Sequence, residues 1–112
     1  KGVAMCVATS TDKSIADEIL ARLGIRDYFS SIVTWKDAGC GKVDPEVFKY
    51  AQSVIGTPTE ETIVLEDGLL AVKGAKEAGF YVIAVADDNE KENRAKIQKA
   101  ADRFIESFEE LL

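Results

Sequence analysis

Three groups of polar side chains in this sequence could support chemistry. Hydroxyl side chains follow an apolar run at residues 9–11, Lys42 lies beside a glycine, and two acids, Glu66 and Asp67, follow a later apolar run. Hydroxyls at the start of a helix favour an anion, because free backbone N–H groups and the helix dipole point there. Lysine supplies a point positive charge, and adjacent carboxylates suit Mg²⁺. Together, these residue types could serve a site for an anion and a metal.

Each group also has a plain structural explanation. Thr11 or Asp12 could simply cap the next helix, which leaves Thr9, at the very end of the apolar run, as the better ligand contact. A single lysine in a loop is usually only solvated. Glu66 and Asp67 could cap the helix that follows them, and from the residues alone capping and metal binding explain the pair equally well.

The pattern around these residues predicts alternating strands and helices. Residues 3–8 read as a strand buried on both faces, and apolar residues at helical spacing predict a helix over 14–23 that ends at Gly24. A polar loop is expected over 36–43, and a solvated helix in the charged stretch up to Lys99. The remaining expected elements are strands at 31–34, 62–65, 80–84 and 103–105, helices at 45–55 and 69–78, and a turn at 107–112. This order predicts an α/β fold with a parallel, helix-flanked sheet, whose ligands bind at the carboxyl ends of the strands.

Length and composition exclude several classes of function. The 112 residues suit one domain, and a net charge of −6 argues against a nucleic-acid surface. No apolar run approaches the roughly 18 residues of a membrane span. Cys6 and Cys40 make no disulfide framework, so we expect a reducing, cytoplasmic setting. The absence of histidine removes Ser-His and Cys-His nucleophile pairs.

The residue patterns of four segments resemble motifs of the haloacid dehalogenase superfamily of hydrolases. Gly41–Phe48 is similar to its Gly-Lys-Pro-x-Pro-x-x-Phe segment, with Val43 in place of the first proline. Leu65–Gly68 is similar to its acid-pair motif, with glycine where serine is more usual. Leu23–Phe29 is similar to the family's helix-to-strand segment, and Ala101–Ile105 is similar to its C-terminal segment. The resemblance covers essentially the whole chain and is greatest to the subgroup of beta-phosphoglucomutase and phosphoglycolate phosphatase.

This resemblance implies a Rossmann-like, three-layer α/β/α fold and a Mg²⁺-dependent phosphatase that acts on a small phosphorylated metabolite. Thr9 would hydrogen-bond the transferring phosphoryl group, with Ser10 adding contacts in the same loop. Lys42 would neutralise phosphoryl charge. Asp67 would bind Mg²⁺ directly and Glu66 would support it through water.

The chain departs from the family in one large respect. The family attacks with an Asp-x-Asp pair, through an aspartyl-phosphate, and this chain holds no such pair. The most similar segment, Asp87–Asn89, does not follow the N-terminal strand, where the family has its pair, and is interpreted as a solvated turn. The resemblance places the nucleophile strand and the cap before Lys1, with that strand between the strands ending at Thr9 and Leu65. We therefore expect residues 1–112 to be the C-terminal part of a core domain that is inactive alone and marginally stable, self-associated or held by a separate N-terminal piece.

Three other functions stay open at this point. A phosphosugar mutase would use the same mechanism. Haloacid dehalogenase itself needs no metal, so the pair Glu66 and Asp67 argues against it. A receiver-like or degenerate binding module would not be an enzyme, although receivers place their acid pair before the hydroxyl and the lysine, the reverse of the order here.

Overall fold

The structure is a computed structural model that describes residues 2–39 and 44–112. The chain divides into two compact units, Lys1–Thr57 and Pro58–Leu112, which are described separately below. Each unit holds parallel strands connected through helices, so the predicted α/β class is confirmed. The arrangement as a single domain stays a prediction. Within the described residues, no helix has the length and apolar character that crossing a membrane would need.

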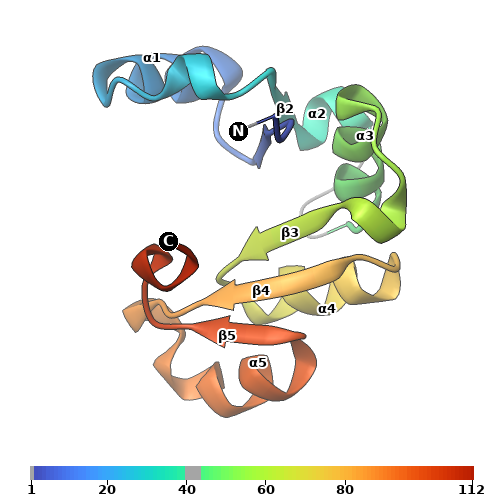
Figure 1. Cartoon of the computed structure of the whole chain (residues 1–112), viewed down its shortest axis with the longest axis vertical. Helices are drawn as coiled ribbons and strands as arrows, with labels where there is room; N and C mark the ends of the chain where they lie inside the picture. Colours follow the sequence, from blue (N-terminus) through green and yellow to red (C-terminus); the bar gives the residue numbers. More distant parts are fainter. Residues whose placement is uncertain (1, 40–43) are drawn as a thin grey trace. The chain divides into compact units, whose positions relative to one another are not determined.

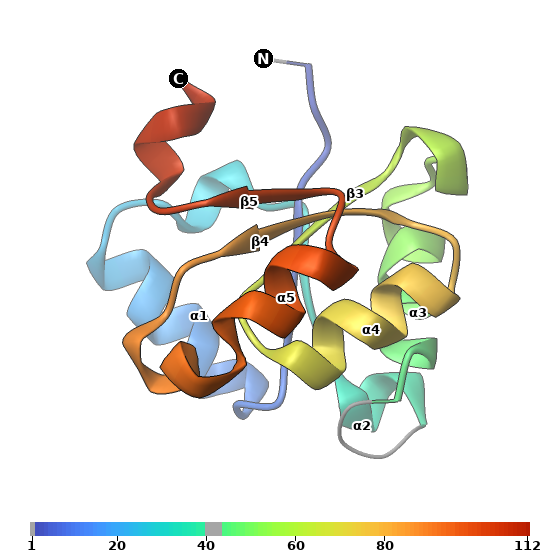
Figure 2. The ribbon, with the colours of Figure 1, turned by 90° about the horizontal axis from the view of Figure 1, so that it is seen from below.

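The first unit is built on a pair of parallel strands. Strand β1 (Cys6–Thr9) pairs with β2 (Ser31–Thr34), from Cys6 opposite Ser31 to Thr9 opposite Thr34. The helices are α1 (Lys13–Arg22), α2 (Trp35–Ala38), α3 (Glu46–Ile55) and the short 3₁₀ turn η1 (Arg26–Tyr28). Helices α1 and α3 lie on opposite sides of the strand pair (Figures 1 and 2). This unit therefore has the three-layer order that the sequence predicts.

Local signals in the sequence explain where these helices begin and end. Gly24 has a left-handed φ of 74°, and the N–H of Ile25 donates to the carbonyl of Leu20, which is the hydrogen-bond pattern of a Schellman cap. The Asp44 carboxylate accepts the N–H of Glu46 at 3.0 Å, at the start of α3. The helix end at Gly24 agrees with the expectation from sequence, and the N-cap residue of α3 is Pro45.

Helix α2 is a correction to the sequence analysis, which expected a loop over 36–43. Thr34 accepts the N–H of Asp37 through its hydroxyl, and the Asp37 carboxylate accepts the N–H of Thr34, so the two residues form a capping box. This reciprocal pair supports a single helical turn at Trp35–Ala38 that carries too few residues to show apolar periodicity.

The burial expected for the first strand and helix is also wrong. All four residues of β1 have intermediate exposure, although the run predicted a strand buried on both faces. On α1 only Ala16 is buried, and Ile15 and Ile19 are exposed. An apolar pattern shows that a strand can be buried, but full burial needs partners on both faces and both edges, and β1 contacts β2 and α3 without being fully buried.

The second unit is a three-stranded parallel sheet with two helices on one face. Strand β4 (Tyr81–Val85) lies between β3 (Ile63–Glu66) and β5 (Arg103–Ile105). Helices α4 (Leu69–Glu77) and α5 (Arg94–Ala100) cover the same face (Figure 2). The 3₁₀ turns are η2 (Thr59–Glu61), η3 (Asp88–Asn93) and η4 (Phe108–Leu111). The charged stretch is therefore only partly α-helical, because η3 is kinked at Glu90 before α5 begins.

Strand β3 stands at an edge of this sheet and exposes apolar residues. Within residues 58–112 it pairs only with β4, and its Ile63 and Leu65 side chains are 55% and 47% exposed. In contrast, Val82 and Ala84 of β4 are fully buried. Strands of parallel sheets are ordinarily covered on both faces. The open edge and the uncovered face of β3 are thus both unusual for such a strand.

A clamp of one acid and one lysine fastens the second sheet to its helix. The Lys76 ammonium on α4 donates to the Asp102 carboxylate at 2.7 Å, and to the carbonyl of Phe80 at 3.3 Å. The same Asp102 carboxylate accepts the backbone N–H of Val82 at 2.8 Å. Asp102 therefore ties α4, the start of β4 and the entry to β5. The hydrogen bond from Lys76, and then that from Val82, hold the pKa of Asp102 below its ordinary value.

Replacing Asp102 with asparagine should destabilise the chain. Asp102→Asn removes the ion pair and weakens acceptance of the Val82 N–H, so we expect a loss of about 1 to 2 kcal/mol in urea unfolding. Glu46→Gln, which breaks the exposed pair with Lys49, is the matched control and should change the free energy of unfolding by less than about 0.5 kcal/mol.

The effect should also depend on pH. Because the pKa of Asp102 is lower in the folded state than in the unfolded chain, its stabilisation is complete above the unfolded value and is lost as the pH falls through the folded one. The difference in the free energy of unfolding between the parent and Asp102→Asn should therefore narrow below pH 3.8. An equal difference in the free energy of unfolding at neutral and acidic pH would contradict this stabilising role of Asp102.

Candidate functional site

The hydroxyl loop of the first unit lies between β1 and α1. The Thr9 hydroxyl accepts the N–H of Thr11 at 3.0 Å, which leaves its own O–H proton free to be donated to a ligand. Ser10 is exposed beside it. Asp12 occupies the N-cap position of α1, but its side chain makes no capping hydrogen bond. Capping by Asp12, which the sequence suggested, is therefore not observed.

A hydrogen-bonded network that the sequence analysis missed stands next to this loop. Thr34 pairs with Thr9 in the strand register, and Thr34 shares the capping box with Asp37. The Lys13 ammonium lies 2.9 Å from the Asp37 carboxylate. This contact with Lys13 is the main cause that lowers the pKa of Asp37. The network links the first residue of α1 to the carboxyl end of β2; the Thr-x-x-Asp spacing was the available signal for it.

Lys42, the predicted basic group, lies outside the described residues, as does Cys40. The segment that contains it follows α2, whose C-cap is the left-handed Gly39, and precedes Asp44, whose carboxylate accepts the N–H of Glu46 in α3. Its predicted contact with an anion therefore stays a prediction.

The acid pair belongs to the second unit, at the carboxyl end of β3. Glu66 is the last residue of the strand rather than the first after it, and Asp67 follows. The Glu66 carboxylate accepts the N–H of Asp67 at 3.1 Å. Burial raises the pKa of Glu66, and the negative charge of Asp67 acts in the same direction. The structure thus brings the two predicted acids together, one half-buried and the other exposed.

A third carboxylate, that of Asp87, joins this pair. Asp87 follows β4, the neighbour of β3, so parallel strands deliver both acids to the same edge. Burial raises the pKa of Asp67 and the neighbouring Asp87 carboxyl raises it further, whereas the N–H of Asn89 and the contact with Asp67 lower the pKa of Asp87. The sequence interpretation of Asp87 as part of a solvated turn missed this contact.

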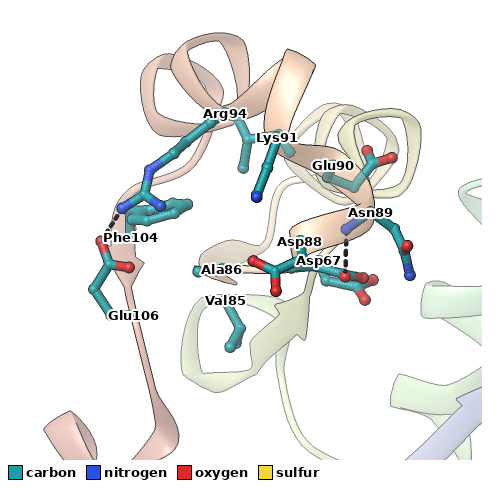
Figure 3. Close-up of a pocket in the computed structure, with 12 residues that line it drawn as sticks. Asp67, Val85, Ala86, Asp88, Asn89, Glu90, Lys91, Arg94, Phe104 and Glu106 are labelled. Atoms are coloured by element: carbon teal, nitrogen blue, oxygen red, sulfur yellow. Dashed lines mark hydrogen bonds and ion pairs between the residues drawn. The ribbon is translucent and has the colours of Figure 1, made fainter.

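Asp67 and Asp87 border a hollow of about 600 Å³ in the second unit. Figure 3 shows Asp88 and Lys91 directed into the hollow and Arg94 over the ring of Phe104. The Arg94 guanidinium carbon lies 4.9 Å from the ring centroid, and the same guanidinium forms an ion pair with Glu106. Acids outnumber bases along this hollow, which favours a cation beside Asp67 over a bare anion.

The chemistry of the donor set fits Mg²⁺. Glu66, Asp67 and Asp87 offer hard carboxylate oxygens, and Mg²⁺ is commonly held by one or two carboxylates together with water and phosphate oxygens. In the part of the chain that the structure describes, no group of three or more such side chains is placed to enclose a metal ion. The assignment of Glu66 and Asp67 to Mg²⁺ therefore stays a prediction.

Comparison with known proteins decides the family. A family model described as haloacid dehalogenase-like hydrolase matches residues 1–79. The chain belongs to this family. A fructose-1-phosphate phosphatase of Escherichia coli is 30% identical over 72% of this chain and 43% of its own length. A glyceraldehyde 3-phosphate phosphatase of Methanocaldococcus jannaschii is 32% identical over 85% of this chain and 41% of its own length.

Solved structures of the family agree with the fold. CbbY from Rhodobacter sphaeroides, solved in complex with phosphate, matches with a TM-score of 0.83 and 27% identity over 98% of this chain and 49% of its own. A HAD phosphatase from Thermococcus onnurineus matches with a TM-score of 0.82 and 26% identity over 98% of this chain and 49% of its own. The haloacid dehalogenase-like chain thus spans about half the length of the relatives it matches.

Proposed function

We propose that this chain carries the phosphate-binding and metal-binding parts of a Mg²⁺-dependent phosphatase that acts on a small phosphorylated metabolite. The observation that carries the proposal is the acid pair Glu66 and Asp67 at the carboxyl end of β3, in a family whose matched relatives are phosphatases. Carboxyl ends of parallel strands are where α/β folds bind ligands. Two sugar-phosphate phosphatases among the relatives favour hydrolysis over a mutase reaction, for which the same groups would serve.

Each predicted site residue has a distinct role in this proposal. The Thr9 hydroxyl donates a hydrogen bond to a phosphoryl oxygen, and Ser10 adds a contact from the same loop. Lys42 neutralises phosphoryl charge. Asp67 holds Mg²⁺ directly and Glu66 holds it through water, because the Glu66 carboxylate already accepts the N–H of Asp67. Bound Mg²⁺ would stabilise negative charge on the phosphoryl group, and such electrostatic stabilisation is the main source of rate in phosphoryl transfer.

The nucleophile of the reaction lies outside this chain in our proposal. We propose that an aspartate on a further strand, which pairs with the open edges of β1 and β3, attacks phosphorus. The P–O bond to the metabolite breaks and the metabolite leaves as its alcohol, and water then hydrolyses the aspartyl-phosphate to inorganic phosphate and the free aspartate. Support comes from the incomplete burial of strands β1 and β3 and from the length of the relatives, about twice that of this chain. The chain alone would then be inactive and prone to self-association through its strand edges. The cysteine content supports a cytoplasmic setting.

Mg²⁺ dependence tests the metal site. In the full-length protein, Asp67→Asn should raise the Mg²⁺ concentration for half-maximal hydrolysis of a generic phosphate ester at least about tenfold, and Glu66→Gln less than about threefold. The reason is that Asp67 is exposed at the strand end, whereas Glu66 is committed to a backbone N–H. A chelator should abolish turnover in the parent. If the two variants raised the half-maximal Mg²⁺ concentration equally, or in the opposite order, direct coordination by Asp67 would be contradicted.

Turnover of a lysine variant tests the phosphate site. In the full-length protein, Lys42→Ala should lower kcat at least about a hundredfold, which corresponds to about 2.7 kcal/mol of transition-state stabilisation. Lys36→Ala, which removes an equal charge from the exposed surface of α2, is the control and should keep kcat within about twofold of the parent. Parent-like turnover of Lys42→Ala would contradict the assignment, and an inactive parent would favour a degenerate binding module.

A further inference from the structure

The helix that follows the acid pair begins without a side-chain cap of its own. The N-cap residue of α4 is Gly68, which has no side chain, so the first N–H groups of the helix need acceptors from another segment. One of them is supplied from far along the chain: the N–H of Leu69 donates to the Glu90 carboxylate at 3.1 Å. Residue 90 belongs to η3, the turn that follows β4.

The position of Glu90 is itself fixed by local hydrogen bonds. The N–H of Glu90 donates to the carbonyl of Asp87 at 2.9 Å, and the N–H of Asn89 donates to the Asp87 carboxylate at 2.9 Å. Glu90 leaves helical geometry at φ −113° and ψ 20° and is half-buried. In Figure 3 its carboxylate lies on the side of α4. A carboxylate that accepts a backbone N–H at a helix N-terminus makes a charge-assisted bond aligned with the helix dipole.

We infer that Glu90 is a positioning residue for Asp67. The loop from Asp67 to Leu69 is held at one end by β3, where Glu66 pairs with Ala84, and at the other by the Leu69–Glu90 bond. With both ends fixed, the Asp67 carboxylate has a defined place beside Asp87. The inference rests on the proposed metal site and deepens it: the turn after β4 determines where the metal-binding acid after β3 stands.

A direct ligand role for Glu90 is the alternative that this geometry disfavours. Glu90 lines the hollow that Asp67 borders, but its Oε1 accepts the N–H of Leu69 and its carboxylate lies on the side of α4 in Figure 3. The two roles differ in what they require of residue 90. Positioning requires an oxygen that accepts a hydrogen bond, which glutamine also offers, whereas coordination of Mg²⁺ favours a carboxylate.

The test compares three variants of the ¹⁵N-labelled full-length protein titrated with Mg²⁺ alone. Glu90→Ala removes the acceptor, Glu90→Gln keeps it without the charge, and Glu92→Ala removes an equal charge from an exposed position of the same turn. NMR gives the Mg²⁺ dissociation constant from the amide shifts of Asp67 and Gly68, and it gives the exchange rate of the Leu69 amide. The melting temperature of each variant is measured in parallel.

We expect Glu90→Ala to raise the dissociation constant about tenfold and to speed exchange of the Leu69 amide, because the loop loses one of its two attachments. Glu90→Gln and Glu92→Ala should stay within about threefold of the parent dissociation constant. Rescue by glutamine at position 90, with the melting temperatures of Glu90→Gln and Glu90→Ala equal, would support positioning over general stability.

Two results would overturn the inference, and a third would overturn its foundation. Parent-like Mg²⁺ binding in Glu90→Ala would show that the bond does not position Asp67. If Glu90→Gln weakened Mg²⁺ binding as much as Glu90→Ala, the charge of Glu90 would matter and not its hydrogen-bond acceptor. If Asp67→Asn leaves the Mg²⁺ shifts of the parent unchanged, the proposed metal site itself is wrong, and the two failures are thereby distinguished.

Discussion

A strand in a parallel sheet satisfies its backbone N–H and C=O groups only when it has a neighbour on each edge, and the rest of this structure depends on that requirement. In the described residues β1 pairs only with β2, and β3 only with β4. Both strands are apolar, yet both are less buried than the strand beside them. The predicted hydroxyl loop and the acid pair each follow directly from one of these two strands. The groups that could do chemistry thus stand on the strands that most need a partner.

Local hydrogen bonds shape the candidate loops of each unit separately. In the first unit, the capping box of Thr34 and Asp37 and the ion pair with Lys13 connect the ends of β2 and α1. In the second unit, the bond between Leu69 and Glu90 connects the loops after β3 and β4. Both networks use short polar contacts between consecutive βα loops, so the loops keep their form through their own unit. Such preformed loops suit phosphoryl transfer, which depends on fixed charges more than on moving parts.

Much of the fold could be predicted from sequence because its signals are local. Gly24 and Gly79 mark helix ends by their left-handed backbone, and the acid pair was placed within one residue of its true position. The exposure of β1 could not be predicted, because an apolar run does not reveal whether its neighbour is present. The bond between Leu69 and Glu90 was equally hidden, since it joins residues 21 positions apart through tertiary structure. Helix α2 was missed because one turn carries too little periodicity.

Our central proposal is that the open edge of β1 and the open edge of β3 are each completed by further strand pairing in the full-length protein. Amide hydrogen exchange in the 112-residue chain and in the full-length protein tests it most directly. We predict that alternate N–H groups of β1 and β3, those turned away from β2 and β4, exchange rapidly in the 112-residue chain at low concentration. The same groups should become protected in the full-length protein, while those of β4 are protected in both. Equal exchange of the β1 and β3 edge amides in the two proteins would contradict the account.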